Sequence, residues 1–202
     1  MADSLRGRRI GFCLTGSFCT LERVFAQMEA LSAEGAELLP ILSYNVDRLD
    51  TRFFTAAEVK RRLCRITDKP ILRTIQDVEP IGPAHMTDLM IVAPCTGNTL
   101  AKLACGMVDT PVTMAVKSHL RGMKPVLLCV ATNDALGAAA RNIGALMNYK
   151  HIYFLPLEQD DVSRKPNSVV ARMELMRAGA LAALEGRSLQ PLLCGPRAAG
   201  GA

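Results

Sequence analysis

The segment covering residues 88–106 constrains the fold more than any other part of this chain. It begins with an apolar, β-prone run (DLMIVA) and continues through a turn of small residues (PCTGN). Leu100, Leu103 and Ala104 then follow at helical spacing. A strand, a tight turn and a helix in this order are typical of an α/β fold, and the turn leaves backbone N–H groups free at a helix N-terminus. The segment therefore predicts a site for a phosphate or another anion.

A second turn of the same kind lies near the N-terminus, within residues 11–20 (GFCLTGSFCT). Gly16 allows the backbone to approach a ligand closely, and the hydroxyls of Thr15 and Ser17 can donate to phosphate oxygens. The turn lacks the three glycines of a dinucleotide-binding loop. Ser43 stands where that type of site has an acidic residue after its second strand. The two turns together favour a mononucleotide site, although each alone is also explained as an ordinary capped helix start.

The alternation of strand-like and helix-like segments predicts the architecture. We expect a Rossmann-like or flavodoxin-like α/β domain over residues 8–185, with a doubly wound six-stranded parallel sheet and right-handed crossovers. A flexible C-terminal tail is expected at 193–202. The predicted strands are 9–15, 37–43, 70–75, 87–93, 124–131 and 152–157, and the predicted helices are 20–34, 55–66, 99–105, 110–120, 133–147 and 166–184.

Three local signals refine this prediction. Pro40 inside the second strand favours an edge strand or a bulge. Thr55 and Glu58 have the spacing of a capping box at the start of a helix. Lys117, His119 and Arg121 end the helix 110–120, where cations are favoured by the helix dipole.

Composition restricts the function classes. The 202 residues are 50% apolar, enough for one sizeable core, and only 4% aromatic, so this core is aliphatic. The net charge of +5 is scattered and not interleaved with aromatic residues, which argues against nucleic-acid binding and favours a small anionic ligand. We find no signal peptide and no long apolar run, and expect a cytoplasmic protein that does not bind a membrane.

The seven cysteines contain no C-x-x-C pair, and no Cys, His and Asp set has the spacing of metal ligands. In the cytosol we expect reduced thiols, most of them serving as small buried apolar side chains. Cys95 lies at a helix N-terminus, which lowers a thiol pKa and would suit a nucleophile. No histidine stands at a fixed offset to activate it, so the structural interpretation is favoured.

Candidate site residues follow the carboxyl ends of the predicted strands, where ligands bind in open parallel sheets. Asn133 and Asp134 follow the fifth strand and can orient a substrate or relay a proton. Lys165 follows the sixth strand and can hold a carboxylate, although a solvated loop explains it as well. The predicted cofactor-binding residues are Thr15, Gly16, Ser17, Ser43, Pro94, Thr96, Gly97, Asn98 and Thr99.

These residues resemble a known family. The stretch APCTGNTLAKLACG is similar to the PASANT-type motif of the flavin-containing cysteine decarboxylase superfamily, and LTGSF is similar to its FMN phosphate loop. The resemblance is closer to one branch, the dipicolinate synthase B subunits of spore-forming bacteria. It covers residues 8–185 and includes the motifs EPIGP (79–83), DTPVTMAVKSHLR (109–121), TNDALGAAARNIG (132–144) and QDDVSRKPNS (159–168).

The resemblance implies an FMN cofactor and, as partner, a dipicolinate synthase A subunit that is similar to nicotinamide-dependent dehydrogenases. It further implies a small dicarboxylate substrate from lysine biosynthesis, a role in the mother cell of a sporulating bacterium, and a homo-oligomer built on trimers. A flavin is a sensible acceptor for the hydride equivalents lost when the pyridine ring is aromatised. The apolar face of the helix 110–120, with Val112, Met114, Ala115 and Val116, is the expected self-association surface.

Two alternatives remain at this stage. One is a flavin-dependent decarboxylase or a flavin prenyltransferase. The decarboxylases carry a histidine eight residues before the residue matching Asp88, but this chain has Pro80 there, and His85 is out of register. The other alternative is a non-catalytic FMN-binding scaffold for the dehydrogenase-like partner.

Overall fold

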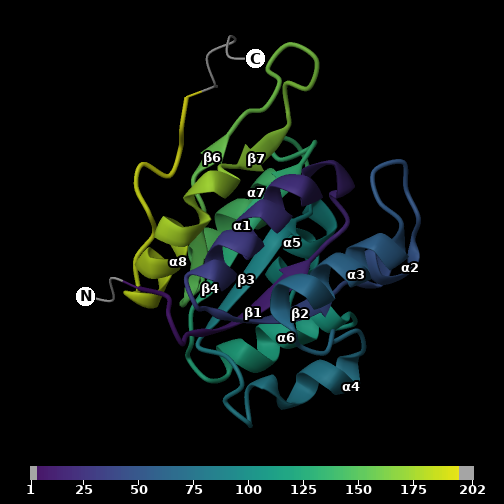
Figure 1. Cartoon of the computed structure of the whole chain (residues 1–202). Helices are drawn as coiled ribbons and strands as arrows, with labels where there is room; N and C mark the ends of the chain where they lie inside the picture. Colours follow the sequence, from purple (N-terminus) through teal and green to yellow (C-terminus); the bar gives the residue numbers. More distant parts are fainter. Residues whose placement is uncertain (1–3, 196–202) are drawn as a thin grey trace.

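The strands of the computed structural model, which describes residues 4–195, form one sheet through the centre of the molecule (Figure 1). The strand order is β2-β1-β3-β4-β7-β6, and β5 also pairs with β4. Strands β1 to β5 are parallel, whereas β7 is antiparallel to both β4 and β6. The strands are β1 (Arg9–Leu14), β2 (Glu37–Leu42), β3 (Leu89–Cys95), β4 (Val126–Thr132), β5 (Ile152–Phe154), β6 (Leu157–Glu158) and β7 (Val169–Ala171).

Helices cover both faces of the sheet, so the predicted doubly wound α/β fold is confirmed. The helices are α1 (Leu21–Ala33), α2 (Tyr44–Arg48), α3 (Ala56–Thr67), α4 (Ile75–Val78), α5 (Gly97–Ala104), α6 (Pro111–Leu120), α7 (Ala140–Met147) and α8 (Met176–Leu184), with 3-10 turns η1 (Phe18–Thr20), η2 (Glu79–Ile81) and η3 (Met173–Leu175). Helices α1 and α8 lie over the face turned to the viewer in Figure 1, and α5, α6 and α7 pack behind it. The predicted capping box of Thr55 and Glu58 starts α3.

The prediction of six parallel strands is wrong in its last third. The segment 152–157 divides into β5 and β6, because Pro156 lacks the N–H that a continuous ladder needs. The segment 166–184 is not one helix, since Val169 and Val170 pair with the end of β4 and only α8 is helical. β-branched side chains suit a strand, and the prediction of one long helix did not take this local preference into account.

The outer edge of β2 also differs from the prediction. The segment 70–75 contributes a single bridge, between Leu72 and Ile41, rather than a third full strand. Leu72 donates its N–H to the carbonyl oxygen of Pro40. β2 is therefore an edge strand, as the internal proline predicted.

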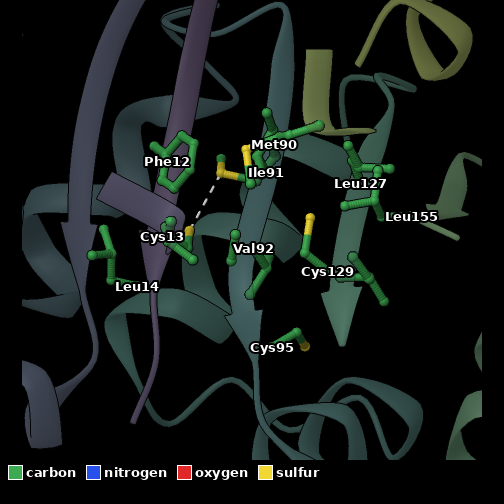
Figure 2. Close-up of a cluster of buried hydrophobic side chains, with 14 of the residues drawn as sticks. Phe12, Cys13, Leu14, Met90, Ile91, Val92, Cys95, Leu127, Cys129 and Leu155 are labelled. Atoms are coloured by element: carbon green, nitrogen blue, oxygen red, sulfur yellow. Dashed lines mark hydrogen bonds between the residues drawn. The ribbon is translucent and has the colours of Figure 1, made fainter. Parts of the chain in front are cut away.

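The core between the sheet and its helices is mostly aliphatic, with buried sulfur atoms and three buried phenylalanines, Phe12, Phe25 and Phe154. Figure 2 shows Phe12, Cys13 and Met90 on neighbouring strands, with the Cys13 and Met90 sulfurs 3.5 Å apart. Cys129 lies in the same cluster. All seven cysteines are free, but only Cys13, Cys95 and Cys129 are buried, so the expectation that most would be buried is wrong.

The beginning of the predicted C-terminal tail is bonded to the sheet. Leu157 donates its N–H to the carbonyl oxygen of Leu192, and the Cys194 N–H donates to the carbonyl oxygen of Leu157, each at 2.8 Å. Residues 196–202 lie outside the described residues.

His119 is a buried neutral side chain rather than a cation at the helix end. Its Nε2 lies 2.9 Å from the carbonyl oxygen of Pro125, which accepts the ring N–H. Its Nδ1 therefore accepts from the Thr87 hydroxyl at 2.8 Å. Burial lowers the pKa of His119 from 6.5 to about 4, since desolvation penalises the imidazolium.

This burial predicts a loss of stability in mild acid. As the pH falls from 6.5 to about 4, the unfolded chain binds a proton at His119 that the folded chain does not bind. The free energy of unfolding therefore falls by up to about 3 kcal/mol over this range. Urea titrations across this range should show the fall in the wild type and a flatter profile in His119→Gln. The exposed His85, whose positive φ suits asparagine, provides the control His85→Asn, which should keep the wild-type profile. An unchanged profile in His119→Gln would contradict the assignment.

Candidate functional site

The two small-residue turns meet at the point where the strand order reverses. The parallel strands have the order 2-1-3-4-5, and in such sheets ligands bind between the carboxyl ends of β1 and β3. The buried Thr15 hydroxyl donates to the Pro94 carbonyl oxygen at 2.6 Å and accepts from the Thr96 N–H at 3.1 Å. The turn after β1 is thus bonded directly to the turn after β3.

A cleft of about 170 Å³ opens beside this junction. It contains six of the nine predicted cofactor-binding residues, drawn from the ends of three adjacent strands. The residues that line it are Thr15, Gly16, Ser43, Tyr44, Asn45, Thr96, Asn98, Thr99, Lys102, Thr110 and Val112.

The other three predicted residues have different positions. Pro94 lies inside β3, where its carbonyl oxygen holds Thr15. A Cβ on Gly97 would lie 2.9 Å from the Thr132 hydroxyl oxygen, so close packing against the end of β4 requires this glycine. Ser17 follows Gly16 and is half-buried, outside the residues that line the cleft.

The N-terminus of α5 has the character of an anion site. Its N-cap residue Thr96 makes no capping hydrogen bond to any described residue, and its hydroxyl lies 3.1 Å from that of Thr99 instead. The first turn of α5 carries no acidic residue in the described chain. Its backbone N–H groups and the positive end of the helix dipole therefore face the cleft without an internal partner.

Contacts within the chain account for Ser43 but not for Gly16. A Cβ on Gly16 would make ordinary contacts at 3.6 Å with Asn45 and Phe18, so packing does not require a glycine there. A glycine at this position leaves the backbone open to close approach by a ligand, as expected from the sequence. Ser43, in contrast, caps α2 by accepting the Val46 N–H at 3.4 Å, which gives it a structural role as well as a place in the cleft.

Sequence reasoning missed the cleft residues that come from α2, α5 and α6. Tyr44 and Asn45 directly follow Ser43, and Lys102 stands one helical turn after Asn98, so helical spacing could have indicated it. Thr110 caps α6, and only the packing of α6 beside α5 brings it to the cleft.

The predicted substrate residues Asn133 and Asp134 lie at the same edge of the sheet. Asp134 Oδ1 accepts from the Thr132 hydroxyl at 2.6 Å and lies 3.1 Å from the position of a Cβ on Gly97. Asn133 Oδ1 accepts from the Ser168 hydroxyl at 3.3 Å, which joins it to the β6–β7 loop. Asp134 therefore adjoins the turn that carries the candidate anion site.

Lys165 stands apart from these groups. It is exposed in the β6–β7 loop, and its Nζ lies 3.7 Å from Asp160 Oδ2, the one ion pair it makes within residues 4–195. The neighbouring Arg164 pairs with Asp161 at 2.8 Å. Its carbonyl oxygen accepts the N–H of Ser168, the residue whose hydroxyl donates to Asn133.

Cys95 does not have the environment of a nucleophile. Its side chain is fully buried, and burial raises the pKa of its thiol well above the ordinary value. A neutral thiol is a poor nucleophile, so the structural interpretation of Cys95 is supported. Among residues 4–195 no three His, Cys, Asp or Glu side chains gather as a metal site would require. In the same part of the chain, no helix combines the length and apolar character needed to cross a membrane.

Comparisons with known proteins agree with this geometry. The chain is 46% identical to the dipicolinate synthase B subunit of Bacillus subtilis (strain 168) over 191 residues, which cover 95% of this chain and 96% of that protein. The crystal structure of the dipicolinate synthase B subunit from Bacillus halodurans C superposes with a TM-score of 0.87 at 43% identity, covering 95% of this chain and 98% of that one.

More distant structures share the fold alone. The FMN-dependent cysteine decarboxylase SpaF has a TM-score of 0.63 at 18% identity, covering 90% of this chain and 99% of that one. The sequence also matches the Flavoprotein family over residues 1–176, a span that includes the turns after β1 and β3 and all the residues of the cleft. The chain therefore belongs to the Flavoprotein family.

Proposed function

We propose that this chain binds FMN at the cleft between β1 and β3 and serves as the B subunit of a dipicolinate synthase. Its partner would be the dehydrogenase-like A subunit, and its substrate a small dicarboxylate of the lysine pathway. The observation that carries the proposal is the open N-terminus of α5 beside Gly16, at the strand-order reversal of a chain similar to dipicolinate synthase B subunits.

The residues of the cleft fit the phosphate end of FMN. The hydroxyls of Thr96 and Thr99 and the amide of Asn98 line it together with the free N–H groups of α5. The cleft, at about 170 Å³, is smaller than the pockets of about 300–1,000 Å³ that enclose drug-sized ligands. It has room for the phosphate and part of its chain, so the flavin ring would extend beyond it.

When bound, FMN would supply an acceptor for the hydride equivalents released as the ring is aromatised. This chain's contribution would be positioning and proton handling. The Asp134 carboxylate, held by the Thr132 hydroxyl, can accept a proton near the turn of Gly97. The Asn133 amide can orient a substrate from the same edge, and the exposed Lys165 can offer its ammonium to a substrate carboxylate from the β6–β7 loop.

Cysteine decarboxylation is not favoured. The position of the decarboxylases' histidine is Pro80, which lies within η2 and has no group that titrates. His85 is exposed and has a left-handed backbone conformation in the loop before β3. The remaining alternative, an FMN-binding scaffold that does no chemistry, differs from the proposal in the kinetics of the two-chain enzyme, which a substitution at a substrate-binding residue of this chain would then leave unchanged.

The first prediction concerns the cofactor. The purified protein reconstituted with FMN should show visible flavin bands after desalting, and Gly16→Val should lose them because its γ-methyl groups enter the phosphate cleft. Gly16→Ala is the matched control, since its Cβ has ordinary contacts only and the fold should be kept. Thermal melting followed by circular dichroism checks folding. Equal FMN content in wild type and a folded Gly16→Val, or a wild type that stays colourless, would argue against the proposal.

A homo-oligomer would complete the site. The predicted self-association face on α6 is wrong, since Val112, Ala115 and Val116 are at most 1% exposed and belong to the chain's own core. Exposed apolar side chains instead lie around α7, where Leu136 is 56% and Met147 40% exposed beside an apolar groove. A second copy on this face would bury that surface, and could also cover a flavin ring that the cleft leaves open.

Light scattering tests this second prediction. At micromolar concentration the wild type should have the mass of an oligomer of identical chains. A paired substitution, Leu136→Glu with Met147→Glu, should shift it toward the monomer because charges would be buried at the interface. A wild type that is monomeric, or a double variant with unchanged mass, would contradict the assignment of this face.

The third prediction concerns substrate binding with the dehydrogenase-like partner present. Lys165→Met should raise the substrate KM of the two-chain enzyme by about ten- to a hundredfold, since losing a charge-assisted hydrogen bond costs about 1.5–3 kcal/mol. Flavin content and melting temperature should not change, because Lys165 is exposed and its ion pair is long. Arg164→Met is the neighbouring control. Unaltered kinetics in Lys165→Met would leave this lysine as a solvated loop residue.

A further inference from the structure

Lys102 is the one cation among the residues that line the cleft. It lies on α5 one turn beyond Asn98, and its side chain is only 20% exposed. Thr110 and Val112, at the start of α6, line the same cleft. The ammonium of Lys102 and the first turn of α5 therefore belong to the same cleft.

The hydrogen bonds of Lys102 leave one N–H donor of its ammonium unused within the described chain. Its Nζ donates to both carboxylate oxygens of Asp109, at 2.8 and 2.7 Å. A lysine ammonium has three N–H donors, and the described chain offers Lys102 no third acceptor within hydrogen-bond distance. A lysine with two donors fixed and one free is oriented before any ligand arrives.

We propose that the free donor of Lys102 binds the flavin phosphate and makes this site select FMN over riboflavin, which lacks the phosphate. This inference rests on the proposed function and adds a specificity-determining residue to it. Asp109 acts as a positioning residue: it stands directly before Thr110, the N-cap of α6, and holds the lysine against the cleft. A charge-assisted bond to a phosphate is among the stronger hydrogen bonds in proteins.

A purely structural role is the competing explanation. The Lys102–Asp109 pair also joins the end of α5 to the start of α6, and a cation near a helix C-terminus is favoured by the helix dipole. In that case loss of the lysine would loosen the cleft for any flavin. The two explanations therefore differ in how FMN and riboflavin respond to the same substitution.

The test measures the dissociation constants of FMN and riboflavin by quenching of flavin fluorescence. In Lys102→Met, the Kd of FMN should rise about tenfold or more, because one charge-assisted hydrogen bond is lost. The Kd of riboflavin should stay within about twofold of the wild-type value. Lys150→Met removes one charge from an exposed turn before β5, at the opposite edge of the sheet, and should leave both constants unchanged.

The outcomes separate the inference from the proposed function. A wild type that binds neither flavin overturns the proposed function and the inference with it. If the wild type prefers FMN, and Lys102→Met weakens the binding of both flavins equally or of neither, the inference alone is overturned. If Lys102→Met does not fold, the double variant Lys102→Met with Asp109→Asn removes both charges together. It should lose the same preference for FMN, and a double variant that keeps the preference overturns the inference.

Discussion

The hydroxyl of Thr15 fixes the geometry on which the site depends. It is buried between the turns after β1 and β3, donates to the Pro94 carbonyl oxygen and accepts the Thr96 N–H. Without it, a buried carbonyl and the residue that starts α5 would both lose their partner, at a cost of about 1–3 kcal/mol for each unsatisfied group. At the other end of the same strand pair, Arg9 contacts the Asp88 carboxylate through its backbone N–H and its guanidinium. The two strands that flank the reversal are thus held at both ends.

The sequence was informative where short-range rules decide the structure. Strand β3 and the turn 96–99 could be read from an apolar run followed by small residues, and their position at the reversal follows from parallel topology. The pairing of β6 with β7 could not be predicted from the sequence, because strands of two and three residues have no periodicity of their own. Their strand character comes from pairing with the end of β4, which is a tertiary contact.

The motifs that carry the family resemblance do not all serve the ligand. In EPIGP, Gly82 donates its N–H to the Ser118 hydroxyl, which in turn donates to the Glu79 carbonyl oxygen. A Cβ on Gly82 would overlap the Ser118 carbonyl oxygen, so this motif and the last turn of α6 are matched to each other. The residues of this motif therefore have a role in the shared fold. Gly16 is different because packing permits a side chain there, which agrees with the proposed role of its backbone in binding a phosphate.

The charge of the whole chain contributes little to anion selection at the cleft. Most of the cations that pair do so with carboxylates at the surface, where each pair is worth about 0–1 kcal/mol and is screened over about 8 Å at physiological ionic strength. The field at the cleft is therefore local: it comes from the positive end of α5, the hydroxyls around it and the partly buried ammonium of Lys102. Since the Asp109 carboxylate offsets much of that ammonium's charge, the proposed recognition of a phosphate would depend on the direction of its remaining N–H more than on net charge. The two hydrogen bonds from Lys102 to Asp109 fix the direction of that N–H.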